Sequence, residues 1–355
     1  MNGPPTQTHP KPLLTIAIPT YNRSRYLREL LQSLLEELRG ESRVELIVSD
    51  NASPDETPQL IEELRTQGLE LRLIRNETNI GSDANFLQCF EQAQGKYVWL
   101  MSDDDIILQG CIKQILIYLE SDDYSLLFLA PYGFDNDPIA EFKGDRFGRE
   151  ATTINRADLF VKRVGTGFSL ITCNIVNKQQ ILTTDHRPFA NYIGTNLVQL
   201  SWTYTLLTAF SKGLFVHHRF LAIRNGTSGG YSVTGVFGEN LKSITDELLA
   251  DRPKLAKLTY CSALTGFLPY AILKIRQDLH GNFEKEDFHK KLRPVYGDDL
   301  QYWIYVFPVS RLPLALASVW FAMLCKLNTA RLAGRLLLRL ASGVMNPIGA
   351  QRAWK

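Results

Sequence analysis

The stretch Tyr97-Val98-Trp99-Leu100-Met101-Ser102-Asp103-Asp104-Asp105 decides the fold, because a run of apolar, β-forming residues ends abruptly in three carboxylates. Such a run predicts a buried strand that delivers acids to the edge of a sheet, where open α/β sheets bind their ligands. Adjacent like charges are costly unless a cation neutralises them, and hard divalent ions prefer oxygen ligands. The pattern therefore predicts a metal site for a phosphate-bearing substrate. The alternative is a solvated acidic turn.

The segments upstream favour the metal site, because they alternate in the way a parallel sheet requires. Residues 13–18, 44–48 and 71–75 are short apolar runs that indicate strands, and helical periodicity separates them. Repeated strand, helix and strand are typical of an α/β protein with a mostly parallel sheet. A segment of helical period then leads from about residue 82 to the strand that carries the acids.

The predicted helices have recognisable beginnings. Leucines between Leu27 and Leu38 form one apolar stripe, and Ser24 is available as the cap of that helix. Ser53-Pro54-Asp55-Glu56 is predicted to open the second helix as a capping box with proline at its first position. The third helix is expected to begin near Ser82 and to bury Phe86, Leu87 and Phe90.

Four ordered segments carry a resemblance to a known family. Residues 16–23 (IAIPTYNR), 47–55 (IVSDNASPD), 76–81 (NETNIG) and 102–105 (SDDD) resemble, in sequence and spacing, the inverting, nucleotide-sugar-dependent glycosyltransferase family 2. The resemblance implies a GT-A fold, a Rossmann-like sheet flanked by helices, here followed by a C-terminal helical extension. Within the family the chain is most similar to bacterial enzymes of surface polysaccharide assembly, such as abequosyl and other deoxysugar transferases.

The resemblance also implies roles for individual residues. The donor-binding residues would be Pro19, Thr20, Tyr21, Asn22, Asp50, Asn51, Asn79, Gly81, Asn85 and Asp103. The metal ligands would come from the acid cluster in the order Asp104, Asp103, Asp105, and Ser102 stands where many members carry a further acid. Purely structural readings exist for some of these positions, because Asn79 and Gly81 can form a turn and Asp50 can cap a helix.

The expected chemistry requires a cation and a base. Mg²⁺ or Mn²⁺ would stabilise the charge that develops on a departing nucleoside diphosphate. An inverting transfer also needs a base for the acceptor hydroxyl. The family usually supplies an acid from a stretch that corresponds to residues 192–202, but this stretch contains no acid here. Asn196, Gln199 and Trp202 are candidates for acceptor binding, and core packing is the alternative for Trp202.

Other groups are candidates for the base. Asp185 is the preferred one, Asp105 is a second candidate catalytic acid, and His186, His217 and His218 are further possibilities. The histidines at 217 and 218 are expected to follow a short strand at residues 213–216. The loop at residues 224–232, rich in glycine and small hydroxyl residues, either closes over a phosphate or serves as a linker.

Length, composition and cysteine content limit the kinds of domain that the chain can contain. The chain has 355 residues, of which 45% are hydrophobic and 21% charged, as in globular proteins. Five scattered cysteines argue against zinc ligation and against a disulfide framework. We expect a flexible tail at residues 1–12, a GT-A domain at 13–235 with donor and acceptor halves that meet near 130, a helical accessory region at 236–300, and a membrane-associating tail at 301–355.

The tail is both apolar and basic. After Asp299 the chain has no acid and seven basic residues. The apolar stretch from Leu312 to Cys325 has 14 residues, short of the roughly 20 that span a bilayer. Arg331, Arg335 and Arg339 follow at four-residue spacing. This pattern predicts an amphipathic helix on the cytoplasmic face of an anionic inner membrane. Packing on the protein itself or at a dimer contact is the alternative.

Two classes of function follow. The first is a glycosyltransferase that uses a divalent cation to move a sugar from a nucleotide-sugar donor to a lipid-linked or growing glycan. The second is a non-catalytic nucleotide-sugar-binding scaffold of a polysaccharide assembly complex. The intact aspartates favour the enzyme, because a scaffold has no need for clustered carboxylates. A nucleic-acid partner is not expected, since the basic residues lie with an apolar tail and not along an aromatic groove.

Overall fold

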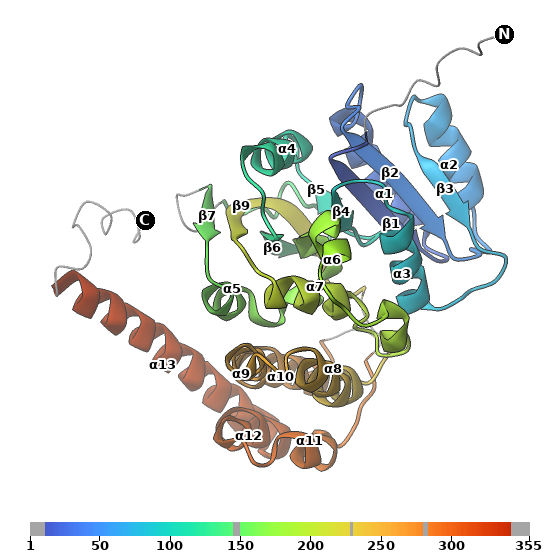
Figure 1. Cartoon of the computed structure of the whole chain (residues 1–355). Helices are drawn as coiled ribbons and strands as arrows, with labels where there is room; N and C mark the ends of the chain where they lie inside the picture. Colours follow the sequence, from blue (N-terminus) through green and yellow to red (C-terminus); the bar gives the residue numbers. More distant parts are fainter. Residues whose placement is uncertain (1–10, 145–149, 228–229, 280–282, 342–355) are drawn as a thin grey trace, which may run out of the picture.

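A computed structural model describes residues 11–144, 150–227, 230–279 and 283–341, with side chains through Leu327. The described part has a mixed sheet with strand order β3-β2-β1-β4-β8-β6-β9-β5, and β7 pairs with β9. The strands of the first half, β1 to β4, are mutually parallel. Helices flank this sheet, and a second group of helices lies below it in Figure 1. The predicted α/β fold class is confirmed.

The first half follows the predicted alternation closely. Its elements are β1 (Leu14–Thr20), α1 (Ser24–Glu37), β2 (Val44–Asp50), α2 (Thr57–Thr66), β3 (Arg72–Arg75), α3 (Ser82–Gln92) and β4 (Tyr97–Leu100). The leucine stripe of α1 is buried as expected, from Leu27 to Leu34. Both faces of a parallel sheet are covered by helices, so β1 and β4 are buried along their whole length.

The predicted starts of the first two helices were wrong in their details, whereas the third helix begins at Ser82 as expected. Ser24 does not cap α1; it is the first helical residue, and its backbone N–H donates to Asp55 Oδ2 at 2.8 Å. The second helix begins at Thr57, not at Pro54, and Glu56 is the residue that precedes it. Ser53 Oγ accepts from the backbone N–H of Asn22 at 2.9 Å. Ser53 and Asp55 thus join the loop after β2 to the segment after β1, because their side chains accept hydrogen bonds from N–H groups of that segment.

The second half completes the sheet. Its main elements are β5 (Ile106–Ile107), α4 (Cys111–Ser121), β6 (Leu126–Phe134), β7 (Ala151–Ile154), α5 (Ala157–Val164), β8 (Asn174–Asn177), α6 (Lys178–Thr183), α7 (Gln199–Thr208) and β9 (Gly213–Arg224). β9 is longer than the predicted strand at residues 213–216. His217 and His218 therefore lie inside it and not beyond its end, in the segment between its pairings with β7 and β5.

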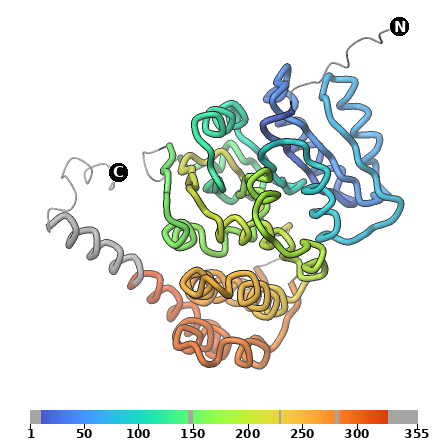
Figure 2. Tube along the Cα trace, in the orientation of Figure 1, coloured from blue at the N-terminus to red at the C-terminus, as the bar shows by residue number. Residues whose placement is uncertain are grey.

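The remaining chain is helical. It comprises η4 (Gly235–Asn240), α8 (Leu241–Leu248), α9 (Pro253–Ser262), η5 (Ala263–Phe267), α10 (Leu268–Arg276), α11 (Phe288–Tyr296), η6 (Tyr302–Val306), α12 (Phe307–Arg311) and α13 (Leu314–Ala341). Figure 2 shows this group as the orange part of the trace, beside the green segments that contain α5 and α7. α8 and α9 contact α7 and α5, which joins the two groups.

One continuous helical stretch, Pro253–Arg276, has the length and apolar composition of a membrane span, but half of it is buried inside the described fold. The helix Leu314–Leu327 is apolar and shorter. Arg331, Arg335 and Arg339 lie in α13 beyond the described side chains, so the predicted basic face is outside the part of the chain that the structure can test.

Candidate functional site

The carboxyl ends of β1 and β4 create the site. These two strands are parallel neighbours, with Ala17 opposite Leu100, and the chain then winds outward from β1 toward β3 on one side and from β4 toward β8 on the other. Ligands of open α/β sheets bind where the strand order reverses in this way. The residues that follow β1 therefore meet the acids that follow β4, and Thr20 Oγ1 donates to Asp103 Oδ2 at 2.7 Å.

The three aspartates are buried, which excludes the solvated turn. Asp103 is 2% exposed, and Asp104 and Asp105 are each 5% exposed. Ser102 Oγ donates to Asp104 Oδ1 at 2.5 Å. Thr172 Oγ1 donates to Asp105 Oδ2 at 2.5 Å. Buried charge of one sign is costly, so this cluster requires cationic partners.

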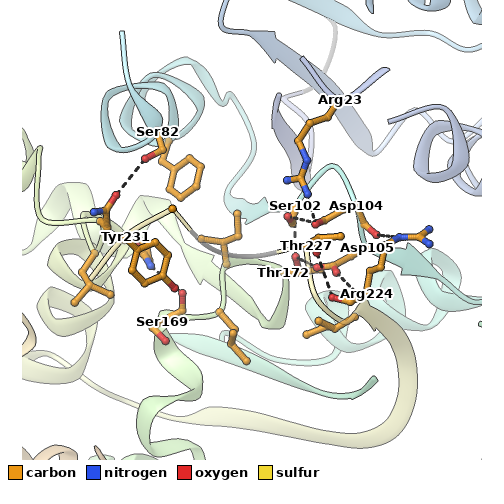
Figure 3. A pocket seen from close by; sticks show the side chains of 18 of the residues that line it. Arg23, Ser82, Ser102, Asp104, Asp105, Ser169, Thr172, Arg224, Thr227 and Tyr231 are labelled. Carbon is orange, nitrogen blue, oxygen red and sulfur yellow. Dashed lines mark hydrogen bonds and ion pairs between the residues drawn. The ribbon is translucent and has the colours of Figure 1, made fainter. Parts of the chain in front are cut away.

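Two arginines supply positive charge. Arg23, directly after β1, places Nη1 at 3.0 Å from Asp103 Oδ1 and Nη2 at 2.6 Å from Asp104 Oδ2. Arg224, at the end of β9, donates its backbone N–H to Asp105 Oδ1 at 3.2 Å and its Nε to the carbonyl oxygen of Asp104 at 3.2 Å. Figure 3 shows both arginines on either side of the acids. The cluster is thus drawn together from three strand ends.

Burial dominates the electrostatics of the cluster. Desolvation raises the pKa of Asp103 to about 7, although the positive charge of Arg23 acts in the opposite direction. Desolvation and the neighbouring charge of Asp104 raise the pKa of Asp105 to about 7. Both carboxyl groups hold their protons more tightly than an exposed aspartate does, as expected where like charges share a buried site. A bound cation would favour the ionised forms.

A cavity of about 510 Å³ opens beside the acids. Asp104 and Asp105 form part of its wall, together with Arg23 and Arg224, and Figure 3 shows them at one end with Ser82 and Tyr231 at the other. The wall also contains apolar side chains, those of Phe86, Leu170, Ile171, Leu197, Ile223 and Phe237, and polar ones such as Asn196 and Gln199. The cavity thus has a charged end and a mixed polar and apolar remainder. Phe86, expected in the core, is only half-buried and lines it.

The acids fit a divalent cation that is bound together with phosphate. Asp104 and Asp105 face the cavity, whereas Asp103 is not among its lining residues and points to Thr20 and Arg23. Among the described residues, no group of three or more histidine, cysteine, aspartate or glutamate side chains is arranged to hold a metal ion. Mg²⁺ usually takes one or two carboxylates and completes its shell with water and substrate phosphates. Two facing carboxylates are sufficient for that mode.

The residues predicted for the donor lie around β1, β2 and α3. Thr20, Asp50, Asn51 and Asn85 are buried, and Tyr21 is exposed, but none of the predicted donor residues at positions 19–22, 50–51, 79, 81 and 85 lines the cavity. Asp50 Oδ1 accepts from the backbone N–H of Ser53 at 2.9 Å. Its Oδ2 is buried without a hydrogen bond in the described structure, and Arg75 Nε lies 3.4 Å away.

The asparagines of this region bind one another. Asn51 Nδ2 donates to Asn79 Oδ1 at 2.8 Å, and the backbone N–H of Gly81 donates to the same oxygen at 2.9 Å. Ser49 Oγ donates to Asn85 Oδ1 at 2.6 Å. Gly81 has φ of 87°, a conformation that favours glycine. These side chains therefore shape the loop between β3 and α3, which is the structural role weighed for Asn79 and Gly81.

The predicted acceptor residues separate into two groups. Asn196 and Gln199 line the cavity. Asn196 has φ of 57°, and its Oδ1 lies 3.5 Å from Ser82 Oγ. Trp202 is 2% exposed and stacks on Phe90 with ring centroids 4.7 Å apart, so it belongs to the core. Core packing, the alternative considered for Trp202, describes its position.

The structure does not bring the preferred base to the cavity. Asp185 lies on the exposed segment between α6 and η3 (Phe189–Tyr192), outside the cavity lining, and His186 stacks on Phe189 beside it. His217 is buried in β9, where Nε2 lies 2.8 Å from Thr152 Oγ1 of β7. A general base must reach the proton that it removes, and of the predicted catalytic residues only Asp105 lies at the cavity.

Several residues of the site were not singled out from the sequence. Arg23 ends the first quoted motif, yet it received no role. Thr172 supports both Asp105 and the backbone N–H of Ser102, and no local pattern marks it. Asp83, buried in the first turn of α3, accepts backbone N–H groups from Gly194 and Asn196 at 2.8 and 2.7 Å and so fixes the loop that carries Asn196. Such a contact, which joins residues more than 100 positions apart, cannot be read from a local pattern.

Comparisons with known proteins agree with this architecture. Residues 15–182 match the family model of glycosyl transferase family 2. The chain is 28% identical to abequosyltransferase RfbV of Salmonella typhimurium over 239 residues, which cover 63% of this chain and 69% of that protein. It is 27% identical over 142 residues to poly(ribitol-phosphate) beta-N-acetylglucosaminyltransferase TarS of Staphylococcus aureus, a match that covers 40% of this chain and 25% of TarS.

Solved structures show the same fold. The crystal structure of TarS residues 1–349 in complex with UDP-GlcNAc superposes with a TM-score of 0.59 at 17% sequence identity, and the match covers 88% of each chain. The complex of the same TarS segment with UDP gives a TM-score of 0.56 over 73% of this chain and 74% of that chain. The sheet and its flanking helices are therefore of the GT-A type.

Proposed function

We propose that the chain is a glycosyltransferase of family 2, whose model matches residues 15–182, and that it transfers a sugar from a nucleotide-sugar donor to a glycan acceptor in the synthesis of a bacterial surface polysaccharide, with inversion at the anomeric carbon. The observation that carries this proposal is the buried acid cluster at the wall of a cavity of about 510 Å³. The Salmonella relative is named as an abequosyltransferase, which supports a deoxysugar donor for this chain.

We propose that Asp104 and Asp105 hold a Mg²⁺ or Mn²⁺ ion together with the donor diphosphate. The ion would stabilise the charge that develops on the leaving diphosphate. Asp104 is the leading ligand, because it faces the cavity and its position is fixed by Ser102. Thr172 and the backbone N–H of Arg224 orient Asp105 in the same wall. Asp103 accepts a hydrogen bond from Thr20 and does not line the cavity, so we assign it a supporting position in the cluster.

The acceptor side is proposed at the opposite end of the cavity. Asn196 and Gln199 offer polar groups there, and Gln199 Oε1 is buried without a hydrogen bond in the described part of the chain. Such an atom gains free energy when a ligand hydroxyl donates to it. Tyr231 and Phe237 add aromatic surface on the same side. This arrangement fits a sugar ring with one polar and one apolar face.

A direct experiment compares Asp104→Asn with the wild-type chain. We expect Asn at position 104 to lower sugar release from a panel of nucleotide sugars with Mn²⁺ by about 100-fold or more, because a neutral amide is a poor ligand for a hard cation. Asp122→Asn is the matched control, since Asp122 is an acid of the same domain that pairs with Lys212 outside the cavity. Equal loss in both variants would indicate a general folding defect, and equal activity would remove Asp104 from the mechanism.

The base is tested in the same assay. Asp105→Asn and Asp185→Asn are compared for sugar transfer and for binding of the nucleoside diphosphate with Mn²⁺. We expect Asp105→Asn to lose transfer together with Mn²⁺-dependent nucleotide binding, as a metal ligand should, and Asp185→Asn to transfer normally, because of these two residues only Asp105 lines the cavity. Loss of transfer with intact donor binding in Asp185→Asn would restore Asp185 as the base.

We also propose that the C-terminal region contacts the cytoplasmic face of the inner membrane, without a full span. Four exposed apolar residues of α13, here termed the α13 stripe, are spaced at three and four positions: Leu316, Val319, Met323 and Leu327. Residues so spaced lie on one helix face. Ala317 and Leu324 are buried, so the helix packs on the protein with another face. Basic residues follow the stripe in the sequence, and they favour an anionic surface. Such contact suits a lipid-linked acceptor.

A further inference from the structure

Arg23 bridges the two acids that begin the cluster. Its guanidinium group donates to Asp104 Oδ2 at 2.6 Å and lies 3.0 Å from Asp103 Oδ1, so one cation joins both carboxylates. Its side chain is 30% exposed and forms part of the cavity wall. The ring of Tyr26, one turn into α1, lies 5.3 Å from the guanidinium carbon. Arg23 is therefore a paired cation that still borders the space in which a donor would bind.

Arg224 differs from Arg23 in how it is held. Its side chain is only 9% exposed and pairs with Glu29 of α1. Its guanidinium carbon also lies 4.5 Å from the ring centroid of Phe134, within the range of a cation–π contact. Arg224 thus has its own counter-ion and a closed environment. Of the two arginines at the cluster, Arg23 is the one that can leave the acids without becoming buried and unpaired.

A metal ion would compete with Arg23 for the same atoms. The other oxygens of these two acids, Asp103 Oδ2 and Asp104 Oδ1, already accept from the hydroxyls of Thr20 and Ser102. The oxygen of Asp104 that is not held by a hydroxyl is Oδ2, to which Arg23 donates. A cation that binds Asp104 through this oxygen would repel the nearby guanidinium group and so favour its departure from the acids.

We propose that Arg23 is a resident counter-ion of the acid cluster that exchanges partners when the donor binds. Without donor, it neutralises Asp103 and Asp104. With a divalent ion and a diphosphate bound together, Asp104 would hold the ion, and the Arg23 guanidinium group would donate to the diphosphate oxygens, with which arginine forms strong charge-assisted hydrogen bonds. Arg23 thereby disfavours binding of the metal alone and favours binding of the metal with its nucleotide. This inference rests on the proposed function.

The experiment measures binding of Mn²⁺ alone to the full chain through the electron paramagnetic resonance signal of free Mn²⁺, and binding of inorganic pyrophosphate in the presence of Mn²⁺ by equilibrium dialysis. We expect Arg23→Gln to bind Mn²⁺ alone about tenfold more tightly than the wild-type chain, and to bind pyrophosphate in the presence of Mn²⁺ about tenfold more weakly, a coupling within the usual range. Arg23→Lys keeps the positive charge but loses the two-pronged geometry of the guanidinium group. We expect its affinities for Mn²⁺ and for pyrophosphate to lie between those of the wild-type chain and of Arg23→Gln. Arg28→Gln is the control, since Arg28 lies in α1, the helix that begins directly after Arg23, and pairs with Glu63.

The outcomes separate this inference from the proposed function. If Arg23→Gln, verified as folded by circular dichroism, binds Mn²⁺ alone no more tightly than the wild-type chain while both bind Mn²⁺ with pyrophosphate, the counter-ion role is wrong and the metal site stands. If the wild-type chain binds no Mn²⁺ even with pyrophosphate or with UDP, GDP, CDP and dTDP, the metal-assisted function itself is wrong. Tighter metal binding together with unchanged pyrophosphate binding would contradict the exchange of partners.

Discussion

At the residue scale, the three neighbouring aspartates have different environments. Asp103 is held by Thr20 and Arg23, Asp104 by Ser102 and Arg23, and Asp105 by Thr172 and the backbone of Arg224. Three neighbouring aspartates thus have different partners, which, apart from the adjacent Ser102, come from the end of β1 and the residues after it, from the segment just before β8 and from the end of β9. The order of metal ligands inferred from the family resemblance, Asp104 then Asp103 then Asp105, remains a prediction. The cavity favours Asp105 over Asp103 as the second ligand.

The raised pKa of Asp105 makes a prediction about stability and pH. The unfolded chain loses this proton near the ordinary aspartate pKa of 3.8, whereas the folded chain keeps it to about 7. The folded state therefore binds more protons between these values, and its stability falls as the pH rises through this window. In Asp105→Asn this contribution is absent. We expect the stability of Asp105→Asn relative to the wild-type chain to increase by about 2 kcal/mol between pH 5.5 and pH 8.5.

Urea unfolding at the two pH values, in the presence of EDTA, measures this difference. Asp122→Asn serves as the control, because Asp122 is paired with Lys212 at the surface and its pKa is lowered by that pair. Its stability relative to the wild-type chain should stay nearly constant over the same range. A constant difference for Asp105→Asn as well would mean that Asp105 is already ionised at pH 5.5 in the folded chain.

At the scale of single elements, one buried lysine fixes the end of α3. Lys178 is 9% exposed, and its ammonium group donates to the carbonyl oxygens of Phe90, Glu91 and Ala93 at 2.7 to 2.8 Å. These carbonyls belong to the last turn of α3 and to the residue after it, where carbonyl oxygens have no N–H partner within the helix. Lys178 begins α6, so the contact also ties two distant elements together.

Lys178→Met should therefore destabilise the chain by about 2 to 3 kcal/mol, because buried carbonyl groups lose their donor while the apolar volume is largely kept. Lys113→Met on the exposed face of α4 is the matched control and should change stability by less than about 0.5 kcal/mol. Urea unfolding at pH 7.5 measures both variants. A loss below 1 kcal/mol for Lys178→Met would show that water replaces the ammonium group at the end of α3.

The elements also show what the sequence could predict. The strands and helices around β1 to β4 follow from strong periodicity, and the position of the acids follows from the strand that precedes them. The start of α3 at Ser82 also followed. The exact starts of α1 and α2 did not, because Ser53 and Asp55 satisfy N–H groups of the preceding loop and of α1. The length of β9 was underestimated because its polar histidines lie inside the sheet, where Thr152 of β7 contacts His217. The starts of α1 and α2 and the length of β9 were thus decided by hydrogen-bond partners from distant segments of the chain.

At the scale of the whole molecule, the position of the acids could be predicted from the sequence, whereas the base could not, and the donor and acceptor roles of individual residues stay predictions. The acids lie at a sheet edge whose geometry is common to the fold, so local spacing was sufficient to place them. The base and the acceptor residues depend on which part of the long segment between β8 and β9 faces the cavity. That depends on the packing of α7 against α3 and on the loop held by Asp83, neither of which has a local signal.

The proposed membrane contact involves the whole chain and has its own test. Replacement of Val319 and Met323 by glutamate places charge in the middle of the α13 stripe, and we expect it to reduce co-sedimentation with phosphatidylglycerol vesicles by about tenfold. Ile139→Glu is the control, since Ile139 is a highly exposed apolar residue of the GT-A domain. A stripe variant that sediments like the wild-type chain, or that changes only the oligomeric state in solution, would favour packing between protein copies.

The central claim is that the buried aspartates hold a divalent ion for diphosphate departure, and a crystal of the full chain soaked with Mn²⁺ and a nucleoside diphosphate tests it most directly. The claim predicts an anomalous manganese peak within about 2.5 Å of an Asp104 carboxylate oxygen, with the diphosphate completing the shell. A bound diphosphate without such a peak, with Asp104 still paired to Arg23, would contradict it.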